Sequence, residues 1–144
     1  MKLTTHFDLA EFTLSETAAR RGIDNDPPPD IVVNLLALAS TLERIRERLG
    51  HPIIITSGYR SPVLNAAVGG SPNSAHMQGW AADLTCPGFG PPLLVCRAIA
   101  SMPGLRFDQC IHEFGRWCHL SVDPRFRLQT LTIDRRGVRQ GLLP

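Results

Sequence analysis

The feature that most limits the possible folds is an amphipathic segment between residues 30 and 49. Its apolar side chains recur in alternating steps of four and three residues: Ile31, Leu35, Leu38, Leu42, Ile45 and Leu49. That period places them on one side of an α-helix, while the charged residues 43, 44 and 46–48 mostly occupy the other side. We therefore predict one core-forming helix, capped at its start by Asp30 and ended by Gly50.

Short helices are expected before this segment. Asp8 followed by Glu11, and Ser15 followed by Glu16, are typical helix starts, and Gly22 is a typical stop. The N-terminal part of the chain is therefore predicted to be helical.

The second half of the chain is predicted to contain mainly strands. We expect a buried strand at 52–56, an irregular polar loop at 57–75, a strand at 77–85, a helix at 93–101, strands at 107–114 and 117–122, and a hairpin from 128 to 137. Helices first and hairpin-linked strands later favour a single α+β domain over residues 1–144. Its mainly antiparallel sheet would be packed by the N-terminal helices.

Composition excludes several classes of protein. With 43% hydrophobic and 19% charged residues in 144, the chain has the composition of a soluble globular domain. The formal charge is only +2 and the basic residues are scattered, so we expect no nucleic-acid partner. No stretch approaches the ~20 apolar residues that span a bilayer, so membrane insertion is not expected. We expect a monomer that is made in the cytoplasm without a signal peptide.

The four cysteines form no C-x-x-C pair, which excludes a zinc ribbon and a thioredoxin-like site. Each lies in or beside an apolar stretch, so buried, reduced thiols are expected. A disulfide between Cys110 and Cys118 stays open at this point.

Two histidines and an aspartate form a candidate metal site. His76 follows the polar loop, Asp83 comes seven residues later, and His119 lies in a predicted strand. Zinc accepts histidine nitrogen and carboxylate oxygen, and a catalytic zinc has three protein ligands with one position left for water. Spacing alone does not distinguish such ligands from a hydrogen-bonded core histidine and a turn-capping aspartate.

Three sequence blocks carry a resemblance to a known family. SAHMQGWAAD, residues 74–83, matches the signature Ser-x-His-x-x-Gly-x-Ala-x-Asp, SGYRSPVLNAAVGGSPNS is similar to a Ser-Gly-Tyr-Arg-Ser loop, and FDQCIHEFGRWCHLSV is similar to a closing segment. Together they resemble the D-alanyl-D-alanine carboxypeptidase-like zinc peptidases. That family includes vancomycin-resistance dipeptidases and phage L-alanyl-D-glutamate endolysins, and it shares its fold with the hedgehog signalling domain. The similarity runs from about His6 to the C-terminal hairpin.

The resemblance implies a set of site residues and a substrate class. His76, Asp83 and His119 match the ligands of one Zn²⁺ ion. Arg60 matches the loop arginine that steadies the substrate, and its guanidinium suits a carboxylate or a developing oxyanion. Ser74 matches the motif serine, which either contacts substrate or caps a turn. The implied substrates are the stem peptides of peptidoglycan.

The general base departs from the pattern of several family branches. In those branches it lies three residues before the last ligand, where this chain has Arg116, which cannot accept a proton. Glu113 is the nearest upstream acid and resembles the glutamate of the phage-type branch.

The number of residues in the loop of the predicted hairpin, odd or even, decides between two candidate bases. A three-residue loop, 114–116, would place Glu113 on the same face as His119, whereas a two-residue loop would place His112 there instead. We favour Glu113, because it fits the resemblance and because carboxylates serve as the base in many zinc peptidases.

The function that the resemblance implies is hydrolysis of D-amino-acid-containing bonds in stem peptides, by a D,D-carboxypeptidase or an endopeptidase. The expected absence of a signal peptide favours a phage or prophage lysis enzyme (an endolysin) that acts on the wall after release, or a virion-associated protein. The alternative is a non-catalytic, zinc-stabilised module that binds cell wall or a protein partner, which the departure at Arg116 supports.

Overall fold

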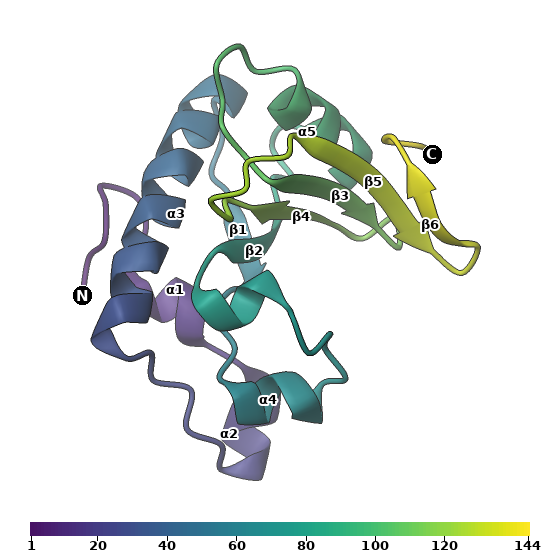
Figure 1. Ribbon diagram of the computed structural model, residues 1–144. Helices are drawn as coiled ribbons and strands as arrows, with labels where there is room; N and C mark the ends of the chain where they lie inside the picture. The colour runs from purple at the N-terminus through teal and green to yellow at the C-terminus, as the bar shows by residue number, and fades with distance from the viewer.

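Helix α3 (Pro29–Leu49) is the longest element of the computed structural model, which describes all residues 1–144 (Figure 1). All six residues of the predicted stripe are buried, and Gly50 ends the helix in the left-handed conformation, with φ of 69°. The predicted cap is wrong, because Pro28 occupies the N-cap position and Asp30 lies inside the first turn. The fixed φ of the prolines starts the helix without a side-chain cap. Neither α3 nor any other helix is long and apolar enough to cross a membrane.

The two short N-terminal helices, α1 (Leu9–Thr13) and α2 (Glu16–Arg21), are confirmed together with their caps. The Asp8 side chain accepts from the first turn of α1 while Glu11 accepts the Asp8 backbone N–H, at 2.7 Å, which completes a capping box. The Ser15 hydroxyl accepts a hydrogen bond at the start of α2, and Gly22 ends that helix with φ of 64°.

A six-stranded sheet forms the other half of the molecule, in the order β1-β2-β4-β3-β5-β6. The strands are β1 (Ile54–Ser57), β2 (Ala81–Thr85), β3 (Gln109–Glu113), β4 (Trp117–Ser121), β5 (Gln129–Asp134) and β6 (Gly137–Gln140). Only the β3–β5 pair is parallel, so the mainly antiparallel α+β architecture is confirmed. The buried strand expected at 52–56 is instead the edge strand β1, where Ile54 is half exposed.

The two faces of the central strands have different roles. Ala82 and Leu84 of β2 and Leu120 of β4 pack into one core with α3 and α5 (Pro92–Ala100). Because side chains alternate along a strand, Asp83 and His119 lie on the opposite face. The sheet therefore separates the core from the candidate site.

Two segments next to the site differ from the sequence prediction. The strand expected from residue 77 begins only at Ala81, because the 3₁₀ helix η1 (Ala75–Gln78) precedes it and ends at Gly79, whose φ is 72°. The loop expected to be irregular at 57–75 contains helix α4 (Pro62–Ala67), capped by the Ser61 hydroxyl. A serine followed by proline is a helix-start signal that the loop composition obscured.

All four cysteines are buried free thiols, as predicted. Cys110 and Cys118 lie on the helix side of the sheet with their Sγ atoms 3.7 Å apart, and no disulfide joins them. Cys96 of α5 completes a cluster of three thiols inside the core.

Candidate metal centre

The three candidate ligands converge from separate elements of the fold. His76 comes from η1, Asp83 from β2 and His119 from β4, where Asp83 and His119 are direct partners in the antiparallel ladder. Asp83 Oδ1 lies 3.4 Å from His76 Nε2 and 3.0 Å from His119 Nδ1. One donor atom from each residue lies within 4.8 Å of the other two. Residues 43 positions apart along the chain therefore face one point.

The orientation of His76 is fixed by the Gly58 backbone. His76 Nδ1 donates to the Gly58 carbonyl at 2.7 Å, which directs Nε2 at Asp83. Such a carbonyl partner sets the tautomer of many metal-binding histidines. Gly58 in turn lies so close to α1 that a Cβ atom there would be 2.5 Å from the Phe12 carbonyl oxygen. Only glycine permits this approach, so α1 contributes to the site indirectly.

Hydrogen bonds from the two histidines keep the Asp83 carboxylate ionised. Burial alone would raise the pKa of Asp83, but hydrogen bonds from His119 and His76 outweigh it and hold the pKa well below its usual range. Burial would lower the pKa of His119, yet its hydrogen bond to Asp83 raises it. For His76, burial dominates and lowers the pKa. An ionised carboxylate between two imidazoles is a donor set that fits a divalent cation, which would replace the shared proton.

Glu113 lies beside the metal ligands. The β3–β4 loop consists of the three residues Phe114–Arg116. The three-residue loop, which places Glu113 on the face of His119, is therefore confirmed over the two-residue loop. Glu113 is opposite Trp117 in the ladder, and its Oε1 is 3.8 Å from His119 Nδ1. Burial raises the pKa of the Glu113 carboxyl group.

His112 lies on the other face of the hairpin. It is paired with Cys118, and its Nδ1 donates to the Leu143 carbonyl at 2.9 Å. The structure therefore places His112 outside the candidate site, with its ring committed to the C-terminal segment.

Arg60 contributes a half-buried guanidinium to the same site. Burial lowers its pKa, whereas the nearby charges of Asp83 and Glu113 oppose that shift. Its Nε is buried and has no hydrogen-bond partner. Arg60 also lines the cavity above the ligands, so its positive charge is available to an anionic ligand.

Ser74 caps η1. Its hydroxyl accepts from the His76 backbone N–H at 3.2 Å, which fixes the start of the turn that carries the metal ligand. The same side chain lines the cavity above the ligands, so a contact with substrate stays a prediction.

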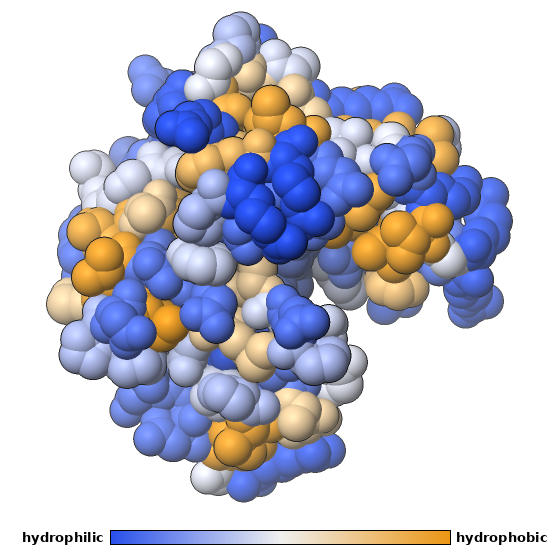
Figure 2. All heavy atoms as spheres, in the orientation of Figure 1, coloured by the Kyte–Doolittle hydropathy of each residue, from blue (hydrophilic) through white to orange (hydrophobic).

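The site lies in an open cavity of about 400 Å³. Figure 2 shows the molecule hollowed in this region, between the segment around α4 and the β5–β6 hairpin. Besides the residues already described, its lining includes Asp108, Gln109 and Arg125. Sequence reasoning missed these three, because no motif marks them and the loop that carries Arg125 reaches the cavity only through the tertiary fold.

Comparison with known proteins gives two matches. A sequence profile of the family described as peptidase M15 matches residues 5–121, which include the three candidate ligands, Arg60 and Glu113. The zinc D-Ala-D-Ala carboxypeptidase of Streptomyces albus G is 44% identical over 52 residues, which cover 35% of this chain and 20% of that protein. The match thus spans about a fifth of the length of that relative.

Proposed function

The chain belongs to the peptidase M15 family, and from that premise we propose that it is a zinc-dependent peptidase that hydrolyses D-amino-acid-containing bonds in peptidoglycan stem peptides. The observation that carries the proposal is the convergence of His76, Asp83 and His119, with Glu113 beside them. The substrate class is supported by the name of the Streptomyces relative, a zinc D-Ala-D-Ala carboxypeptidase.

The donor set fits one zinc ion. Two imidazole nitrogens and one carboxylate oxygen are a usual ligand set for catalytic zinc, and three protein ligands leave a position open. When bound, the ion would supply Lewis acidity toward the scissile carbonyl and the attacking water. The hydrogen bond from His76 to Gly58 holds one ligand in place before the metal arrives.

Glu113 would serve as the general base. Its carboxylate lies on the ligand face of the hairpin, within reach of a water molecule in the cavity. It would accept the proton of the attacking water and then deliver that proton to the leaving amine nitrogen. Arg116, at the position where several family branches carry this base, is exposed at the turn and does not line the cavity.

Arg60 would stabilise negative charge. Arg60 lines the cavity, and its guanidinium stays cationic beside two carboxylates. A donor fixed at this point would bind the oxyanion that develops at the scissile carbonyl, or a carboxylate of the substrate.

The finer assignment follows the phage-type resemblance at Glu113. We propose an enzyme of phage or prophage lysis that acts as a monomer on the wall after release, or from within a virion. Both a D,D-carboxypeptidase and an endopeptidase are compatible with a cavity that is open at its mouth.

The test is digestion of purified sacculi, followed by mass spectrometry of the released muropeptides. Wild type with zinc is expected to release fragments with new termini at one type of bond, and both chelator and Glu113→Gln are expected to abolish release. Binding to sacculi without any fragment, unchanged by Glu113→Gln, would contradict the proposal and indicate a zinc-stabilised binding module.

A further inference from the structure

Arg125 contributes a second guanidinium to the cavity that holds the candidate metal ligands. It follows β4, in the loop 122–128, and its side chain is 61% exposed, so it is accessible to a ligand. We propose that Arg125 forms a subsite that binds a free carboxylate of the stem peptide next to the scissile bond. This inference rests on the proposed function and names the chemical group that determines specificity.

The guanidinium of Arg125 is held in one orientation. Its Nε and Nη2 donate to the two carboxylate oxygens of Asp123, each at 3.1 Å, and its backbone N–H donates to the same residue at 2.9 Å. Its Nη1 makes no hydrogen bond within the chain. The edge of the guanidinium that carries Nε and Nη2 is therefore fixed by Asp123, and Nη1 remains available to a ligand. A donor that is already ordered loses less entropy on binding.

The backbone of this loop is strained and firmly anchored. Phe126 and Leu128 adopt left-handed φ values of 43° and 53°, which bulky side chains rarely do. An ion pair with the buried Asp108 holds the loop in this shape, because Arg127 Nε and Nη2 each donate to Asp108 at 2.8 Å. Strain of this kind persists only where the surroundings enforce it, and here it fixes the position of Arg125.

The cavity lining carries two guanidinium groups, of Arg60 and Arg125, and three carboxylates, of Asp83, Asp108 and Glu113. Arg60 faces Asp83 and Glu113, so its charge is balanced at the reaction centre. A divalent cation on the ligands would reverse this slight excess of carboxylates and so favour an anionic group beside Arg125. Stem peptides carry free carboxylates, and an arginine that presents fixed N–H groups recognises a carboxylate better than it recognises a carboxamide.

The experiment combines substrate and enzyme variants. A synthetic pentapeptide stem and derivatives in which each free carboxylate is singly converted to a carboxamide are assayed for kcat and KM. For wild type, one amidation is expected to lower kcat/KM by about 10- to 100-fold, the range of a charge-assisted hydrogen bond. Arg125→Ala is expected to lose a similar factor on the unmodified peptide and to become insensitive to that one amidation. Arg125→Gln, which is shorter and uncharged but keeps an amide donor, is expected to behave like Arg125→Ala if its fold and zinc content match wild type.

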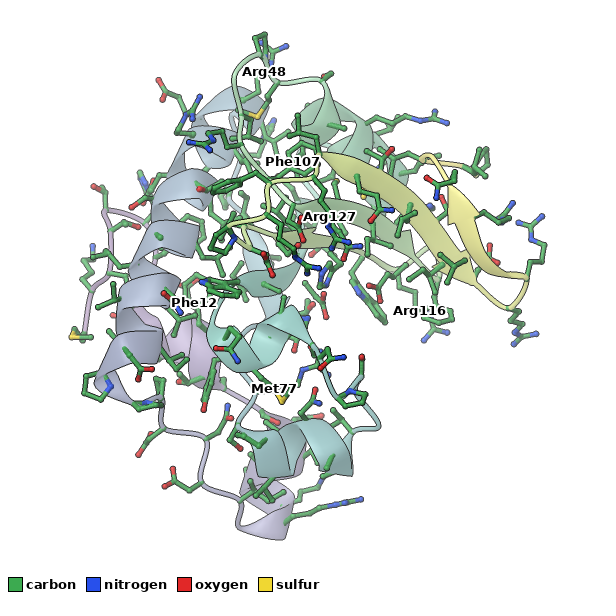
Figure 3. The ribbon with its side chains drawn as sticks, in the orientation of Figure 1. Phe12, Arg48, Met77, Phe107, Arg116 and Arg127 are labelled. Atoms are coloured by element: carbon green, nitrogen blue, oxygen red, sulfur yellow. The ribbon has the colours of Figure 1, made fainter.

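The matched control is Arg116→Ala. Arg116 is also an exposed arginine, but it lies in the turn before β4, whereas Arg125 lies in the loop after β4, and Arg116 does not line the cavity. Figure 3 labels Arg116 apart from Arg127, which belongs to the same loop as Arg125. This variant is expected to keep the amidation pattern of wild type. If wild type cleaves the peptides but the Arg125 variants keep the same sensitivity to every amidation, the subsite is overturned while the peptidase proposal stands. If wild type cleaves none of them, both fail.

Discussion

Glu113 and His119 lie on the same face of the β3–β4 hairpin, with Glu113 Oε1 3.8 Å from His119 Nδ1. The three-residue loop between their strands produces this relationship, with Phe114 and Gly115 both at positive φ. A loop one residue shorter would present His112 instead. The position of the turn thus decides which side chain is available to transfer protons beside the metal ligands.

Glu113→Gln is expected to lower kcat by about 100- to 10,000-fold, the usual contribution of a general base. The amide keeps the size of the side chain but cannot accept the proton. Zinc content and melting temperature should stay close to those of wild type. The assay is release of the product amine from a soluble stem peptide.

The control for that variant is His112→Asn, on the opposite face of the same hairpin. The asparagine amide keeps a donor near the position of Nδ1 but loses the rest of the ring, so stability should fall slightly. The value of kcat should stay within about threefold of wild type because His112 does not reach the cavity. If His112→Asn loses most of its kcat while Glu113→Gln stays active, His112 and not Glu113 is the general base.

Zinc is expected to stabilise the folded chain through Asp83. At free zinc about 100-fold above its Kd, binding adds about 2.7 kcal/mol to the free energy of unfolding. Asp83→Asn removes the charged ligand, so the thermal shift on zinc addition should be lost. The exposed control Asp26→Asn should retain the full shift. An equal shift in both variants would show that the ion binds elsewhere.

Gly58→Ala tests the link between α1 and the metal site. The added Cβ would lie 2.5 Å from the Phe12 carbonyl oxygen, so the loop must move away from α1. We expect a loss of about 1–3 kcal/mol in the free energy of unfolding, together with weaker zinc binding, since Gly58 orients His76. Calorimetric titration with zinc measures the second effect.

The control is Gly22→Ala, where φ is 64° and disfavours alanine but no atom lies within 4 Å of the added Cβ. It should cost about 1–2 kcal/mol of stability through backbone strain and leave zinc affinity unchanged. Unchanged zinc affinity in Gly58→Ala as well would show that the Gly58 carbonyl does not position His76.

The Asp108–Arg127 pair gives a prediction about pH. Hydrogen bonds from Arg127 lower the pKa of the Asp108 carboxyl group below its unfolded value of about 3.9. A depressed folded pKa means that this contribution to stability is present above the unfolded pKa and is lost as the pH falls through the folded one. In metal-free protein at pH 7, Asp108→Asn should therefore be less stable than wild type by about 1–3 kcal/mol.

The difference between the two proteins should shrink below pH 4, as Asp108 becomes protonated in wild type. Urea unfolding at a series of pH values measures it. The carboxylate of Asp134, also paired with arginines but less buried than that of Asp108, offers a comparison, and Asp134→Asn should change stability much less. A constant gap between wild type and Asp108→Asn down to pH 2 would contradict the assigned ion pair.

Local signals allowed much of the fold to be predicted. The stripe from Ile31 to Leu49 determines α3, and side-chain caps at Asp8 and Ser15 determine α1 and α2. The exposure of β1 was not predicted, because an apolar, β-branched segment occurs both in edge strands and in central strands, and its sequence does not distinguish the two.

The candidate metal ligands were accessible from sequence because they lie in family motifs. Arg125 was not, since its place in the cavity depends on two residues in left-handed conformations and on an ion pair between Asp108 and Arg127, 19 positions apart. Neither left-handed position carries a glycine or asparagine that would have marked it. Non-local pairing of this kind leaves no pattern in the sequence.

The most direct test of the central claim is anomalous diffraction at the zinc edge from crystals grown with zinc. One peak is expected, bonded to His76 Nε2, a carboxylate oxygen of Asp83 and His119 Nδ1 at about 2.0–2.2 Å. A peak at the thiols of Cys96, Cys110 and Cys118 with none between the histidines would contradict the proposed metal site, and so would His119 turned away from Asp83.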